Sequence, residues 1–125
     1  MPILTTHAAQ ILNKEFGGTN YTSEVTWFVG LRAGGTELTG SGYARVSVTN
    51  SVGNWATISA NIKVNSIAIT FPQASADWLS ADEVALYVAS SGGTPKYTGV
   101  LDTVVIVRSG QTRSFAAGDL KIKAT

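Results

Sequence analysis

The chain contains no cysteine and only one histidine, His7, among its 125 residues. Disulfide bonds and thiolate metal sites are therefore excluded, and a single imidazole leaves little scope for a metal centre. A Ser-His-Asp triad would depend on His7 alone, and no partner motif accompanies it. We interpret His7 as a solvated or packed helix residue, and we expect neither a cofactor nor a metal ion.

Charged residues are also scarce. They make up 14% of the chain and hydrophobic residues 44%, whereas about 25% charged residues is typical of soluble domains. Nine basic and eight acidic residues give a net charge of +1, which provides no basic patch for phosphates, so no nucleic-acid partner is expected. Because a weakly charged surface favours association, we expect a homo-oligomer.

Long hydrophobic runs are absent as well. No run approaches the roughly 20 apolar residues that cross a bilayer, and the opening MPILTTHAAQ lacks the basic and apolar regions of a signal peptide. We therefore expect a protein that is made in the cytoplasm, with no export signal of its own and no membrane span. The length fits one domain, residues 1–125, because no repeat or linker divides the chain.

One helix is predicted, over residues 5–16. A threonine at its start can cap the N-terminus, and Gly17-Gly18 offers a left-handed stop at its end. Apolar residues recur at approximately helical spacing and form one stripe. Because a partner can order a terminal segment with such a stripe, residues 1–18 are expected to be a docking segment. The stripe consists of Leu4, Ala8, Ile11, Leu12 and Phe16.

The rest of the chain predicts strands. In residues 25–31 and 43–49 apolar and polar residues alternate, which is typical of half-buried strands. The residues expected to face the core are Val25, Trp27, Val29 and Leu31 in the first strand and Ala44, Val46 and Val48 in the second. Residues 84–89 are apolar enough for a strand that is buried on both faces. Further strands are predicted at residues 55–64, 67–71, 96–101, 104–107, 112–115 and 120–123.

The spacing of these strands predicts the fold class. About eight short strands separated by turn residues are typical of an all-β protein and not of a parallel βαβ sheet. We therefore expect an antiparallel β-sandwich, jelly-roll-like in arrangement, with one short N-terminal helix.

The acidic residues and the glycines do not predict catalysis. Most carboxylates fall in expected turns or at strand edges, where solvated charges are common. The adjacent pair Asp82-Glu83 would point to opposite faces of a strand, unlike the facing carboxyl groups of a glycosidase. The glycine pairs lack the lysine context of a phosphate-binding loop. We therefore predict a protein that is not an enzyme.

Aromatic residues are the remaining candidates for a binding role. Trp27 alternates with apolar neighbours and is assigned to the core, whereas Trp55 and Trp78 lie beside loop signals. If exposed, these two rings would fit a protein interface better than a sugar platform, because Trp and Tyr are enriched at interface hot spots. The candidate interface residues are Leu4, Ile11, Leu12, Phe16, Trp55, Trp78 and Tyr97.

Three segments carry a resemblance to a known family. Residues 37–45 (ELTGSGYAR), 68–78 (AITFPQASADW) and 109–120 (SGQTRSFAAGDL), together with Tyr21-Thr22 before Val29-Gly30-Leu31, resemble small tailed-phage and prophage proteins. These proteins are usually labelled tail-fibre or virion structural proteins. The resemblance covers roughly residues 11–123, and its motifs place turns and strands but carry no chemistry.

The resemblance implies a place on a virion. The expected role is a structural protein exposed on the particle, either as a tail-fibre or minor tail component or as a capsid decoration (head-fibre) protein. Other virion proteins would be its partners, and a trimer is favoured because proteins of this kind are often threefold. The alternative is a receptor- or carbohydrate-binding module at a fibre tip, with Trp55, Trp78 or Tyr97 exposed on loops and a host surface receptor as partner.

Overall fold

The structure is a computed structural model of the chain that describes residues 5–18, 23–59 and 62–123. These residues form one helix and ten strands, whereas about eight strands were expected. In chain order the elements are α1 (Thr5–Gly17), β1 (Thr26–Ala33), β2 (Thr36–Glu37), β3 (Val46–Thr49), β4 (Trp55–Ser59), β5 (Ile62–Asn65), β6 (Ile69–Thr70), β7 (Ala81–Tyr87), β8 (Tyr97–Val105), β9 (Ser114–Phe115) and β10 (Lys121–Lys123).

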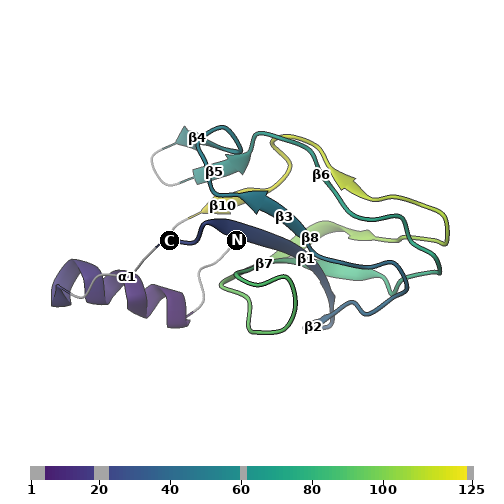
Figure 1. Cartoon of the computed structure of the whole chain (residues 1–125), viewed down its shortest axis with the longest axis horizontal. Coiled ribbons are helices and arrows are strands. Elements are labelled where there is room, and N and C mark those ends of the chain that lie inside the picture. The colour runs from purple at the N-terminus through teal and green to yellow at the C-terminus, as the bar shows by residue number, and fades with distance from the viewer. Residues whose placement is uncertain (1–4, 19–22, 60–61, 124–125) are drawn as a thin grey trace.

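The strands form three antiparallel sheets. The largest has the order β2-β1-β7-β8, and β3 pairs with β1 on the same side as β2. A three-stranded sheet has the order β10-β5-β4, and β6 pairs with β9. Figure 1 shows β4, β5 and β10 towards one end of the molecule and β6 towards the other. The prediction of an all-β, antiparallel, sandwich-like fold with one helix is confirmed.

One hydrophobic core joins the three sheets. Val29 and Leu31 of β1 and Leu86 of β7 pack in the same cluster as Ile69 of β6 and Phe115 of β9. Strand β7 is central, so its apolar run from Val84 to Tyr87 is buried on both faces, as predicted. The prediction extended this strand too far, because Val88 and Ala89 lie beyond its end and are exposed.

The alternation in β1 and β3 predicted the core only in part. Val29, Leu31 and Val48 are buried, but Val25 is 78% exposed because it precedes β1 and has no opposing sheet. Trp27 is half-buried at the margin of the core and meets Tyr97 edge-on, with ring centroids 5.7 Å apart. Ala44 is exposed because β3 begins only at Val46.

Two strand boundaries were also wrong. Residues 55–64 were expected to be one strand, but β4 and β5 pair with each other, so the chain reverses between them. The continuous alternation of apolar residues concealed that reversal. Residues 96–101 and 104–107 were expected to be separate, yet β8 runs from Tyr97 to Val105 and absorbs the extra residues as a shift in register opposite β7. Strand β2 was not predicted.

The three segments that carry the resemblance lie together in the fold. The Ser75 amide donates to the Ser41 carbonyl over 3.1 Å, which joins the second segment to the first. The Ala74 amide donates to the Gln111 carbonyl over 3.0 Å, which joins the second segment to the third. We call this hydrogen-bonded assembly of residues 37–45, 68–78 and 109–120 the loop layer.

Trp78 is the anchor of the loop layer. Its indole Nε1 donates to the Ser41 carbonyl over 2.8 Å, and Tyr43 meets the ring edge-on at 5.4 Å between centroids. A Cβ at Gly40 would lie 2.4 Å from the ring, so only glycine allows this close approach. The receptor-binding alternative required Trp78 to be exposed on a loop, but its side chain fills the space between two loop segments and is only 5% exposed.

We predict that Trp78→Ala lowers the free energy of unfolding by about 3–5 kcal/mol, as large aromatic deletions in cores do. The neighbouring Leu79 is 72% exposed, so Leu79→Ala should change stability by less than about 0.5 kcal/mol. Urea denaturation of the two variants measures both values. Equal effects of the two substitutions would show that the loop layer does not depend on Trp78.

Candidate functional site

A groove opens where the five-stranded sheet and the three-stranded sheet separate. Its volume is about 370 Å³, which lies within the usual range of binding pockets. Residues from β1, β7 and β8 form one wall, residues from β4, β5 and β10 form the other, and the turn that follows β3 forms its rim. The lining residues are Trp27, Asn50, Ser51, Val52, Trp55, Lys63, Leu86, Tyr97 and Ile122. We call this cavity the aromatic groove.

The walls of the aromatic groove are apolar and its rim is polar. Trp27 and Tyr97 meet edge-on within it, and Trp55 contributes a ring that is 5% exposed. The buried Nε1 of Trp55 has no hydrogen-bond partner among the described residues. Lys63 is exposed at the rim and makes no described ion pair. Such a site suits an apolar side chain that is followed or preceded by an acidic one.

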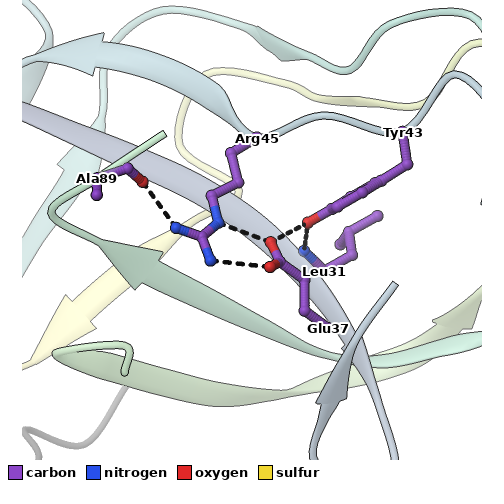
Figure 2. A network of polar contacts seen from close by, with 5 residues as sticks. All are labelled: Leu31, Glu37, Tyr43, Arg45 and Ala89. Atoms are coloured by element: carbon purple, nitrogen blue, oxygen red, sulfur yellow. Dashed lines mark hydrogen bonds and ion pairs between the residues drawn. The ribbon is translucent and has the colours of Figure 1, made fainter. Parts of the chain in front are cut away.

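A second cluster of polar side chains lies on the other side of β1 and β7 (Figure 2). The guanidinium of Arg45 donates to both carboxylate oxygens of Glu37, over 2.7 and 2.8 Å, and to the Ala89 carbonyl over 2.7 Å. The Tyr43 hydroxyl donates to Glu37 over 2.8 Å and accepts from the Leu31 amide over 3.0 Å. We call these contacts the Glu37 network.

The electrostatics of the Glu37 network favour a fixed ion pair. Burial raises the pKa of Glu37, but the hydrogen bonds from Arg45 and Tyr43 outweigh it and leave the pKa below its ordinary value. Burial, together with the nearby carboxylate, raises the pKa of Tyr43. Glu37 is therefore ionised and Tyr43 neutral at physiological pH. Because the strong donors and acceptors are already paired, we interpret the network as structural: it holds Glu37 of β2 against Tyr43 and Arg45.

The structure brings together some predicted interface residues and separates others. Trp55 and Tyr97 both line the aromatic groove. Trp78 lies in the loop layer instead, so the three rings do not form one platform. Trp55, which the receptor-binding alternative required to be exposed, is buried because it begins β4 and packs in the hydrophobic core. Trp27 was assigned to the core alone, and no signal in the sequence indicated that it would also line a groove.

The remaining predicted interface residues belong to the helix. Leu12 and Phe16 are exposed on α1, Phe16 by 87%, and Ile11 is half-buried. Leu4 lies outside the described residues. Figure 1 shows α1 standing apart from the strands, and α1 makes no extensive packing contact with any described strand. The apolar side of the helix is therefore available to a partner.

Residues 5–18, 23–59 and 62–123 contain no group of three or more His, Cys, Asp or Glu side chains that could hold a metal ion. No helix in those ranges is both long and apolar enough to cross a membrane.

These features define a class: an all-β protein whose distinctive segments build structure, with apolar surfaces where a partner can bind. The family model described as podophage GP4 fiber I protein gp80 matches residues 2–123. The chain therefore belongs to this family of phage fibre proteins and is a virion structural protein, which confirms the family resemblance at this level. No curated protein matches the chain.

We predict that the stabilising effect of Glu37 depends on pH. Because the folded protein lowers the pKa of Glu37, the ionised carboxylate stabilises the fold above the ordinary pKa of 4.5, and this contribution is lost as the pH falls through the folded pKa. Glu37→Gln should therefore be clearly less stable than the parent at pH 7, and the difference should shrink in acid. Thermal unfolding of both proteins from pH 7 to pH 3 measures it. A difference that stays constant over this range would contradict the ionic role of Glu37.

Proposed function

We propose that the chain is a non-catalytic fibre component exposed on the phage particle, attached to a neighbouring virion protein through its N-terminal helical segment. It acts as one domain, and its copies form a homo-oligomer, with a trimer favoured. No cofactor takes part. The fibre lies at the tail or on the head.

The exposed apolar side of α1 carries this proposal. An isolated helix of 13 residues is only marginally stable in water. The exposed side chains of Phe16 and Leu12 do not stabilise it, because they bury no apolar surface. Burial of apolar surface at about 25 cal/mol per Å² would stabilise both the helix and its attachment. A partner that covers this side therefore explains why the sequence keeps an apolar stripe outside the core.

A second surface supports assembly. Strand β8 forms one edge of the five-stranded sheet. Val100 and Val104 on this strand, and Ile106 directly after it, are exposed. Exposed apolar edge strands favour contact between chains, and the net charge of +1 offers little repulsion. Closed rotational symmetry would cover such surfaces in a finite assembly.

We predict that Phe16→Asp prevents incorporation of the protein into particles, because a carboxylate cannot be buried in an apolar contact without a partner. Leu79→Asp is the matched control, since Leu79 is comparably exposed but lies beside the loop layer. Phage that lack the gene are complemented with each variant, and the protein content of purified particles is measured. Gold labelling of the parent protein then locates the fibre on the head or the tail. Normal incorporation of Phe16→Asp would contradict attachment through α1.

We also predict that the purified chain self-associates. Light scattering at micromolar concentration should give three times the chain mass of 13.1 kDa if the favoured trimer forms. A monomer would remove the homo-oligomer from the proposal and leave attachment to a different virion protein, which the incorporation experiment tests separately.

A further inference from the structure

We infer that the aromatic groove is the binding site for helix α1 of a second copy of this chain. The inference rests on the proposed function: it identifies the neighbouring virion protein that α1 contacts as a second copy of this chain, and it names the two surfaces that meet. One surface is the apolar side of α1, with Leu12 and Phe16. The other is the cavity between the two larger sheets, lined by Trp27, Trp55 and Tyr97.

The two surfaces agree in size and in chemistry. The groove has a volume of about 370 Å³ and apolar walls, so it can accept an aromatic side chain such as Phe16 with part of its neighbour Leu12. Aromatic rings favour edge-to-face contacts with one another, and the groove already presents Trp27 and Tyr97 in that arrangement. Among the described residues, Phe16 has the most exposed aromatic side chain.

The charges beside the two surfaces are opposite. Glu15 is exposed on α1 next to Phe16, and Lys63 is exposed at the rim of the groove. Neither side chain has an ion-pair or hydrogen-bond partner among the described residues. When Phe16 enters the groove, Glu15 can reach Lys63 at its edge. A rim pair of this kind contributes modestly to affinity and more to the register of binding.

A second copy, and not the same chain, is the occupant. None of the α1 side chains that the structure describes lines the groove, and Figure 1 shows the helix standing apart from the strands of its own chain. A helix that leaves one chain and enters the groove of the next makes a head-to-tail contact. Such contacts close into rings when the rotation allows it, which agrees with the trimer proposed above.

Disulfide trapping tests the contact directly, because the chain has no native cysteine. One chain carries Phe16→Cys and a second, differently sized by a tag, carries Val52→Cys at the exposed rim of the groove. Mild oxidation of the mixture should give a mixed dimer that contains both tags. Leu79→Cys replaces Val52→Cys in the control, which should give at least tenfold less mixed dimer.

The same pair in one chain distinguishes the occupants. If α1 binds its own groove, the double variant Phe16→Cys/Val52→Cys forms a disulfide within a monomer and the mixture forms none, which would overturn the inference. Trapping no better than with Leu79→Cys would overturn it as well. If the chain is an oligomer that fails to trap, the proposed self-association survives and only the named contact fails.

Charge exchange provides a second test that does not disturb the core. Glu15→Lys and Lys63→Glu each place like charges together, so each should weaken self-association by about two- to fivefold in the dissociation constant. The double variant restores opposite charges and should regain most of the parent affinity. Additive weakening in the double variant would contradict the proposed pairing of α1 with the groove. Thermal unfolding at a dilution that gives monomers verifies that each variant is folded.

Discussion

The buried guanidinium of Arg45 is the constraint that organises the β-domain. Its side chain is 2% exposed, and a buried charge without a partner would cost several kcal/mol. Glu37 must therefore stay beside it, and this fixes the β1–β2 hairpin against the segment that enters β3.

Arg45 also lies 3.4 Å above the ring of Tyr87, so its side chain covers this ring on the outer face of β7. Gly30 makes room for this arrangement, because a Cβ there would lie 2.9 Å from both Tyr43 and Tyr87. These side chains therefore help to bury the outer face of the central strands.

The three segments that carry the family resemblance have clear roles in packing. The first contains Glu37, Tyr43 and Arg45 and so supplies the network, while its Gly40 lies against Trp78 of the second segment. The third segment is held by Asn65, which is fully buried and whose side chain accepts from the Leu120 amide and donates to the Ala116 carbonyl. Polar groups in such positions are costly when unpaired, so each restricts its neighbours. The contacts described for these segments therefore stabilise the fold.

The sequence predicted those parts of the structure that depend on local pattern. The helix, the doubly buried strand β7 and the inward side of β1 at Val29 and Leu31 follow from periodicity. The errors lie where distant segments decide the outcome. Trp78 lies beside loop signals in the sequence. Its burial depends on Ser41 and Gly40, nearly 40 positions away, so no local pattern could predict it. The aromatic groove was not predictable for the same reason, since its two walls come from different sheets and no local pattern reports how far apart they stand.

The placement of the groove has a physical consequence for a fibre protein. A sandwich whose sheets separate at one end leaves apolar surface there, and filling the gap with large side chains of the same chain would stabilise the monomer. The chain instead keeps three aromatic side chains around the gap, and Leu12 and Phe16 are exposed on α1, which stands apart from the strands. In the proposed contact between copies, part of the stabilisation would come from association and not from folding, because the groove and the helix would cover each other only in the assembly. A low net charge suits such a protein, since the chains must approach one another closely before those contacts form. The same open groove would then lower the stability of the isolated domain at this end and stabilise the assembled fibre.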